Sequence, residues 1–268
     1  PLKQKNYTDM LSYYYPADAL ATDQFSEFNF RIDTTKDTNR WESHILRRIG
    51  FNSTSCYKAI EISNYIITIG DLSGPRLYLG EGSGAMMATY YMTLGPCINY
   101  YNSGISSHDA TGQRVLSLVP SEYALVAKNN PQEAEMMNNL KVLFNGKPES
   151  TWIGNMDSFK YIMNTVPHSS CALVHSDMES SSEKDDFSIM VEQLHVLALS
   201  INILLEQGIF VTKLAPRFGD KTSSLLNLYY QYYSTVTVFV PASSNPHSTE
   251  IYIICSGKKI STLVYPEM

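Results

Sequence analysis

The chain has 268 residues, of which 44% are hydrophobic, so it can bury one sizeable α/β core or two small ones. Only 17% of the residues are charged, which argues against extensive disorder, and no apolar run of about 18 residues predicts a membrane span. The net charge of −6 argues against a basic surface over the whole chain, although a local basic groove is compatible with it.

In chain order, apolar periodicity and turn residues predict alternating helices and strands. Residues 1–35 are expected to be an N-terminal extension packed on the core, and residues 36–268 the main domain. The first residue is Pro1, which suggests a piece excised from a longer polypeptide. Helices are expected at 39–50, 55–67, 85–94, 191–207 and 222–233. Strands are expected at 76–79, 99–105, 141–144, 171–175, 209–214, 235–240 and 250–255, and a loop-rich insert at 106–131. This alternation predicts a mostly parallel, doubly wound α/β sheet with an antiparallel last strand.

The stretch between Leu79 and Ala85 is the strongest motif, because the glycines Gly80, Gly82 and Gly84 follow an apolar strand and precede a helix. Its spacing fits either a dinucleotide or S-adenosylmethionine (SAM). A carboxylate at Glu81 would repel a pyrophosphate and suit a cationic sulfonium. No acidic residue follows about 20 positions later for a dinucleotide ribose, so SAM is favoured. A glycine turn without a ligand is the alternative.

The four cysteines are scattered without a C-x-x-C pair, and three of them lie in apolar surroundings. This pattern indicates reduced thiols in a cytosolic protein rather than a disulfide framework, and it predicts no metal site.

Charged residues stand at the ends of three predicted core strands. Asp177 closes one strand, Lys213 interrupts another, and Glu250 opens the last one. The carboxyl ends of parallel strands are where open α/β sheets place their sites. Each residue taken alone is more typical of an ion pair or a strand end, but an unpaired lysine within an apolar strand would be costly to bury.

Together with Lys58, these residues occur in the order Lys-Asp-Lys-Glu, which resembles the tetrad of RNA ribose 2′-O-methyltransferases. Longer stretches resemble the methyltransferase domain of the large (L) polymerase protein of non-segmented negative-strand RNA viruses, most of all paramyxoviruses. The resemblance covers roughly residues 40–260. The segments that carry it begin at Leu79, Tyr100, Val142, His175, Val211 and Ser248.

The resemblance implies a Rossmann-like SAM-dependent methyltransferase fold, and an enzyme that methylates the ribose 2′ oxygen of capped viral mRNA. It also implies guanine-N7 methylation at the same site. The implied partners are capped viral mRNA, other domains of the same L polypeptide and the viral phosphoprotein, in the host cytoplasm and the virion. A methyltransferase of another acceptor and a non-catalytic module that binds SAM or RNA are the alternatives.

The chemistry assigns roles within this tetrad. Methyl transfer requires the ribose hydroxyl to lose a proton as it attacks, and Lys213 is the candidate base. The Lys58 ammonium and partial burial favour the neutral amine that a base requires, whereas Asp177 and Glu250 oppose this and orient the lysine.

Further residues are assigned by the resemblance and by their chemistry. Those expected to line the SAM pocket are Gly80, Glu81, Gly82, Ser83, Gly84 and Asp157. For Asp157, a helix N-cap before Phe159 is an equal alternative. His44, Arg47 and Arg48 are candidates for contacts with RNA phosphates or the cap, or for a solvated helix face. His175 is interpreted as a structural strand residue.

Overall fold

An eight-stranded sheet runs through the part of the chain that the computed structural model describes, residues 12–16, 54–104, 120–146, 151–178, 186–214, 220–244 and 250–259. The strands are β1 (Ser12–Pro16), β2 (Arg76–Leu79), β3 (Asn99–Asn102), β4 (Leu140–Val142), β5 (Cys171–Ser176), β6 (Leu204–Leu214), β7 (Tyr233–Pro241) and β8 (Ile251–Lys258). The helices are α4 (Thr54–Ile66), α5 (Ala85–Leu94), α6 (Ser121–Lys128), α7 (Glu133–Asn139), α8 (Met156–Thr165), α9 (Asp186–Ile203) and α10 (Asp220–Tyr232).

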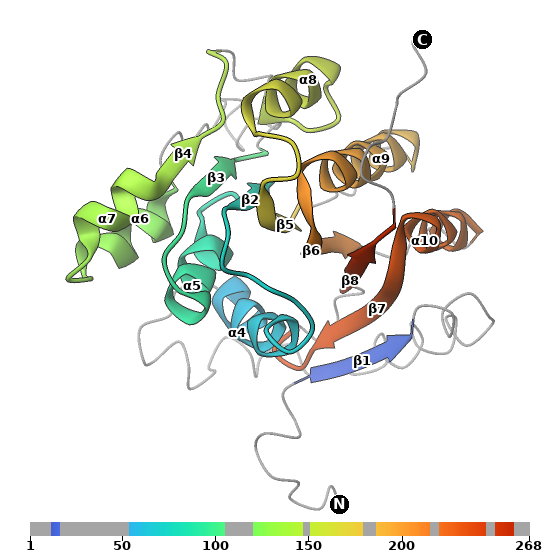
Figure 1. Cartoon of the computed structure of the whole chain (residues 1–268), viewed down its shortest axis with the longest axis horizontal. Coiled ribbons are helices and arrows are strands. Elements are labelled where there is room, and N and C mark those ends of the chain that lie inside the picture. Colours follow the sequence, from blue (N-terminus) through green and yellow to red (C-terminus); the bar gives the residue numbers. More distant parts are fainter. Residues whose placement is uncertain are drawn as a thin grey trace, which may run out of the picture.

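The strands follow the order β1-β7-β8-β6-β5-β2-β3-β4. The five strands from β6 to β4 are parallel to one another, whereas β8 is antiparallel to both β6 and β7. Figure 1 shows α4 and α5 on one side of the sheet and α8, α9 and α10 on the other. The expected mostly parallel, doubly wound sheet with an antiparallel last strand is confirmed.

Each face of the sheet has its own apolar layer, because successive strand residues point to opposite faces. Leu77 and Leu79 of β2 pack in the layer that α8, α9 and α10 cover. Tyr78, between them, packs in the layer under α4, α5 and α6, together with Ile62 and Ile66 of α4. Burial on both faces explains why the central strands read as continuous apolar runs in the sequence.

At the amino edge of the parallel strands, three basic side chains donate hydrogen bonds to carbonyl oxygens at or near the C-terminal ends of helices. The Arg76 guanidinium, at the start of β2, donates to the carbonyl oxygens of Leu72, Tyr90, Leu94 and Gly95 at 3.0–3.3 Å. Lys258 Nζ donates to the Ile201 oxygen in the last turn of α9 and to the Leu204 oxygen at the start of β6. Lys259 Nζ donates to the Tyr230 oxygen in the last turn of α10, at 2.7 Å. Cations are favourable at helix C-termini, whose last carbonyls lack partners within the helix.

Two expectations about elements were wrong. The insert 106–131 was expected to be loop-rich, but its described part, from residue 120 on, contains α6, which is anchored by Tyr123, whose hydroxyl donates to the Met136 oxygen at 2.9 Å. Residues 106–119 lie outside the described residues. The long helix was expected to end at residue 207, but α9 ends at Ile203 and β6 begins at once. Gly208 therefore lies inside a strand, where an added Cβ would come within 3.0 Å of the Ala172 oxygen. Glycine there permits close approach of β5 rather than ending a helix.

The N-terminal extension is described only at β1, which pairs antiparallel with β7 from Ser12 opposite Pro241 to Pro16 opposite Thr237. The boundary at residue 35 stays a prediction, and the expected helix at 39–50 lies outside the described residues. Among the helices that the structure describes, none has the length and apolarity needed to cross a membrane.

Candidate active site

The glycine loop after β2 is tightly packed at both ends and open in the middle. Gly80, Gly82 and Gly84 have φ of 65°, 57° and 80°, a left-handed conformation that side chains rarely adopt. An added Cβ would lie 2.4 Å from Met178 Cγ at Gly80 and 2.5 Å from Pro120 Cβ at Gly84. At Gly82 it would meet no atom of the described residues within 4 Å. The loop therefore presents an unobstructed backbone at Gly82.

Three amides of the loop, those of Gly80, Glu81 and Gly82, already have partners in the protein. The N–H groups of Glu81 and Gly82 donate to the carbonyl oxygens of Asn102 and Ser103, both at 3.2 Å, and Gly80 N donates to Asn102 Oδ1 at 3.4 Å. These bonds fasten the loop to the carboxyl end of β3. A phosphate-binding loop needs free N–H groups that point at the ligand. The loop is therefore better suited to a ligand without phosphate.

Glu81 does not place a charge in the loop. Its side chain is 1% exposed, and Oε1 accepts a hydrogen bond from Met87 N at 3.0 Å. Burial, with a smaller contribution from the Asp177 charge, raises the pKa of Glu81 to about 8, so the carboxyl is mostly protonated at neutral pH. The expected repulsion between a Glu81 carboxylate and pyrophosphate is therefore not supported. A contact between Glu81 and the cofactor stays a prediction.

His175 lies beside Glu81 inside the core. Its Nδ1 is 3.9 Å from Glu81 Oε2, and its ring packs edge-on against Tyr90 with centroids 5.3 Å apart. Burial lowers the pKa of His175 to about 4, so the imidazole is neutral at pH 7. This placement agrees with the interpretation of His175 as a structural residue.

The four tetrad residues form two ion pairs. Lys58 Nζ lies 2.6 Å from Glu250 Oε1, and Lys213 Nζ lies 3.2 Å from Asp177 Oδ1. Their side chains are 11–18% exposed, so the charges are shielded but reachable from solvent. Residues 192 positions apart in the sequence are thus brought into contact.

The sheet register explains this convergence. Ser176 of β5 pairs with Thr212 of β6, which brings the next residues, Asp177 and Lys213, to the same carboxyl edge. Lys213 in turn pairs with Tyr252 of the antiparallel strand β8. Glu250 precedes that strand and reaches the same edge, and α4 supplies Lys58 from above this face.

Tyr252 joins the two ion pairs and was missed by the sequence analysis. Its hydroxyl lies 2.9 Å from both Asp177 Oδ1 and Glu250 Oε1 and can donate to either. Burial, together with these carboxylates, raises the pKa of Tyr252 well above 10, so the hydroxyl keeps its proton. Tyr252 follows Glu250 by two residues at the start of β8, and this same-face spacing in a strand is the signal that could have identified it.

The charges around Asp177 keep it ionised. Burial on its own raises the pKa of the Asp177 carboxyl, but the adjacent Lys213 ammonium and the other positive groups outweigh burial, and the pKa is lowered. The carboxylate is therefore available to bind Lys213 over the whole neutral range.

The other predicted site residues are placed less centrally. The backbone carbonyl oxygen of Ser83 accepts a hydrogen bond from Glu122 N at 2.9 Å, which connects the loop to α6. Asp157 is exposed in the first turn of α8, but the N-cap is Asn155, whose Oδ1 accepts from Asp157 N at 2.8 Å. The N-cap alternative for Asp157 is therefore wrong, and its cofactor contact stays a prediction.

Two further expectations concern the basic residues and metals. His44, Arg47 and Arg48 lie outside the described residues. Within the described ranges, no cluster of three or more His, Cys, Asp or Glu residues could hold a metal ion.

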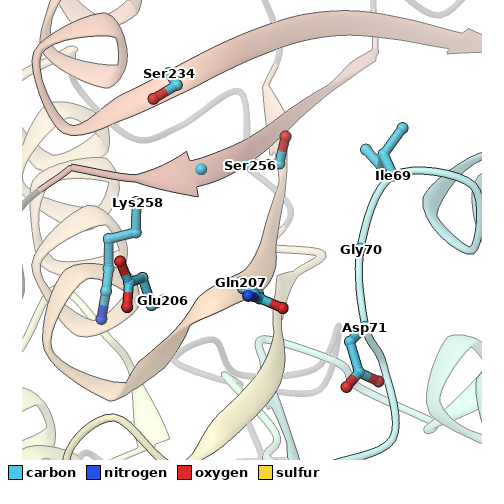
Figure 2. Close-up of a pocket in the computed structure, with 9 residues that line it drawn as sticks. Ile69, Gly70, Asp71, Glu206, Gln207, Ser234, Ser256 and Lys258 are labelled. Carbon is cyan, nitrogen blue, oxygen red and sulfur yellow. The ribbon is translucent and has the colours of Figure 1, made fainter.

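A pocket of about 470 Å³ lies at the opposite, amino edge of the sheet, between the loop after α4 and the ends of β6, β7 and β8 (Figure 2). The lining includes the carboxylates of Asp71 and Glu206 and the hydroxyls of Ser234 and Ser256. Its one lysine, Lys258, is committed to helix carbonyls. Burial lowers the pKa of Lys258 and the Glu206 charge opposes this, but the lining residues form no lysine–carboxylate ion pair like those of the carboxyl edge.

Comparison with known proteins identifies the family of the chain. The sequence profile of the FtsJ-like methyltransferases matches residues 122–258. The RNA-directed RNA polymerase L of Hendra virus is 47% identical over 227 residues, which are 84% of this chain and 10% of the polymerase. That of Sendai virus (strain Z) is 45% identical over 220 residues, 82% of this chain and 10% of the polymerase. The chain thus spans about a tenth of the length of these relatives.

Among solved structures, a ribosomal RNA methyltransferase from Plasmodium falciparum is 14% identical. The match covers 78% of this chain and 98% of that chain, with a TM-score of 0.48.

Proposed function

Because the chain belongs to the FtsJ-like methyltransferases and to the L polymerases of paramyxoviruses, we propose that it transfers a methyl group from SAM to the ribose 2′ oxygen of capped viral mRNA. The family resemblance expected from the sequence is confirmed. The observation that carries the proposal is the pair of lysine–carboxylate contacts, Lys58–Glu250 and Lys213–Asp177, joined by Tyr252 at the edge where the glycine loop emerges.

Lys213 acts as the base that takes the proton from the attacking hydroxyl. Its Nζ is fixed 3.2 Å from Asp177 Oδ1, and the ammonium formed by proton transfer is stabilised by that ionised carboxylate. Lys58, held by Glu250, supplies a second positive charge that disfavours a permanent ammonium on Lys213. The paired contacts fix both amines, so that much of the rate enhancement comes from positioning.

The residues of the loop fit the proposed cofactor. Gly80, Gly82, Ser83 and Gly84 would hold SAM, because the backbone at Gly82 is unobstructed while the loop amides are already bonded to β3. When bound, SAM would supply an electrophilic methyl group on a sulfonium. A cofactor without phosphate does not need the N–H groups that β3 uses.

The remaining functional expectations form part of the same proposal. Guanine-N7 methylation would use the same cofactor site. Capped viral mRNA, the other domains of the L polypeptide and the viral phosphoprotein are the proposed partners. The proposed location is the host cytoplasm and the virion.

Calorimetric titration with SAM tests the cofactor site. A Gly82→Val variant is expected to lose SAM affinity because its side chain would occupy the open side of the loop. Gly146→Val is the matched control, since Gly146 also has a positive φ, 90°, with no atom within 4 Å of an added Cβ. Equal SAM affinity in folded Gly82→Val and wild type would exclude this loop as the site.

Transfer of labelled methyl groups from SAM to capped RNA tests the reaction. We expect label on RNA with a free 2′ oxygen and none on that oxygen when it is blocked beforehand. Label that persists on blocked RNA identifies the guanine or another acceptor. SAM binding without any transfer, by this chain and by the full L polypeptide, would instead indicate a non-catalytic module.

A further inference from the structure

Helix α4 carries two stripes of residues with different tasks. Ala59, Ile62 and Ile66 are fully buried in the core under α4 and α5. The second stripe, at positions 58, 61 and 65, reaches the β7–β8 strand pair instead, as helical spacing of three and four residues allows. Figure 1 shows α4 beside the end of β7. Within this stripe, Lys58 and Glu61 contact residues between β7 and β8, whereas Tyr65 contacts Thr237 inside β7.

Glu61 is the central member of that stripe and is 4% exposed. Its Oε2 accepts a hydrogen bond from Ala242 N at 2.7 Å, and its Oε1 accepts one from Ser243 N at 2.9 Å. Both oxygens of a buried carboxylate are thus used by consecutive amides directly after β7. Hydrogen bonds to a charged acceptor are among the stronger ones in proteins.

The two ends of the β7–β8 connection are held by the same helix. Glu61 binds the residues that follow β7, and Lys58, one turn earlier, binds Glu250, which precedes β8. A shift of α4 relative to the connection would therefore change the distance between Lys58 and Glu250.

We infer that Glu61 is a positioning residue of the methyltransferase site, which fixes Lys58 against Glu250 by fastening the start of the β7–β8 connection to α4. The effect of Glu61 on the reaction rate rests on the proposed function. Its effect on the geometry of Lys58 does not, and that geometry can be measured separately.

The variant Glu61→Gln removes the carboxylate but keeps the size of the side chain. A carboxamide offers one acceptor oxygen, and its NH₂ group would face the second backbone N–H. In the full L polypeptide, kcat for 2′-O transfer is expected to fall about tenfold, the size of one lost hydrogen bond to a charged group, with KM for capped RNA unchanged.

Tyr65→Phe is the matched control on the same stripe. It removes the hydroxyl that lies 3.3 Å from Thr237 Oγ1, within β7, but leaves both ends of the connection fastened. Its kcat is expected to equal that of wild type. An equal loss in both variants would mean that general packing of α4, and not Glu61, controls the site.

Amine labelling of this chain, read by mass spectrometry, gives an answer that does not depend on activity. Lys58 is expected to react faster with an acylating reagent in folded Glu61→Gln than in wild type, while Lys259, which follows β8 at the amino edge of the sheet, reacts equally in both. Unchanged Lys58 labelling would overturn the inference even if activity fell.

The outcomes also distinguish the two hypotheses. A wild-type polypeptide without 2′-O transfer contradicts the proposed function, whereas a fully active Glu61→Gln polypeptide contradicts only the role of Glu61. If Glu61→Gln does not fold, Glu61→Asp replaces it. That side chain keeps both oxygens but is one carbon shorter, and it is expected to increase Lys58 labelling in the same way; unchanged labelling would overturn the inference.

Discussion

The two edges of the sheet use buried cations in opposite ways. At the amino edge, Arg76 and Lys258 donate to carbonyl oxygens at the ends of helices. At the carboxyl edge, Lys58 and Lys213 face ionisable carboxylates, and a tyrosine hydroxyl links the two pairs.

The difference shows which cations can take part in proton transfer. A carbonyl oxygen accepts a hydrogen bond but does not exchange a proton near neutral pH, so the cations of the amino edge act as helix caps. A carboxylate next to an amine stabilises the ammonium and can tune its protonation. A position near an apolar strand therefore does not by itself separate a cation that caps a helix from one that lies in the candidate site. The two kinds differ in their partners, carbonyl oxygens in one case and carboxylates in the other.

The largest expected effect is on the carboxyl edge. Asp177→Ala leaves Lys213 without its ion-pair partner and is expected to lower 2′-O transfer about 10³-fold, while the domain stays folded. Methyl transfer to capped RNA measures the rate, and circular dichroism reports the fold. Asp71→Ala, an exposed carboxylate at the amino edge, is the control. Near-normal activity of Asp177→Ala would refute the tetrad.

The amino edge should respond in stability instead. Arg76→Met removes the donor to four buried or half-buried carbonyl oxygens and is expected to cost about 3 kcal/mol of unfolding free energy. Lys259→Met, at an exposed contact, should change stability by less than about 0.5 kcal/mol. Urea titrations of both variants measure the two losses of unfolding free energy. Equal losses would mean that Arg76 contributes no more to stability than the exposed Lys259.

Tyr252→Phe tests whether the link between the two ion pairs matters. It deletes the hydroxyl that contacts both Asp177 and Glu250. The transfer rate is expected to fall about tenfold with little change in stability, because the ring still fills its place in the core. Tyr233→Phe, whose hydroxyl bonds Ser200 on the other face of the sheet, is the control and should keep full activity. A fully active Tyr252→Phe enzyme would mean that the two ion pairs act independently.

A pH-dependent effect on stability concerns Glu81, next to the carboxyl edge. Its pKa rises from 4.5 to about 8 on folding, so between pH 6.5 and 8 the folded state holds a proton that the unfolded chain has released. Stability must then fall as pH rises through this window, by on the order of 2 kcal/mol. His175, whose pKa falls from 6.5 to about 4, contributes the opposite slope below pH 6.5.

The variant Glu81→Gln is expected to abolish this decline, because a neutral carboxamide keeps the acceptor for Met87 N at every pH. Urea midpoints of wild type and variant at pH 6.5 and 8 measure the difference. Glu206→Gln, an exposed carboxylate at the amino edge, should retain the decline. A wild-type midpoint that does not fall between the two pH values would contradict the raised pKa.

Local signals predicted much of the fold around the site. The strand β2 and the helix α5 were predicted with the bounds that the structure has, Arg76–Leu79 and Ala85–Leu94, because glycines mark both ends of the loop between them. The end of α9 was misplaced, since Gly208 has the same sequence signal whether it ends a helix or lets two strands approach.

The amino-acid sequence by itself determined the alternation of elements, the glycine loop and the positions of Asp177, Lys213 and Glu250 near strand ends, because these depend on nearest neighbours and on periodicity. Only the tertiary structure decided which residues pair: Lys58 with Glu250, and Lys213 with Asp177. It also placed the Tyr252 hydroxyl between the two ion pairs. It also turned Glu81 from an expected charge in the loop into a buried, protonated carboxyl. Pairing and burial are long-range properties, set by strand register and by what each helix covers, and no local pattern encodes them.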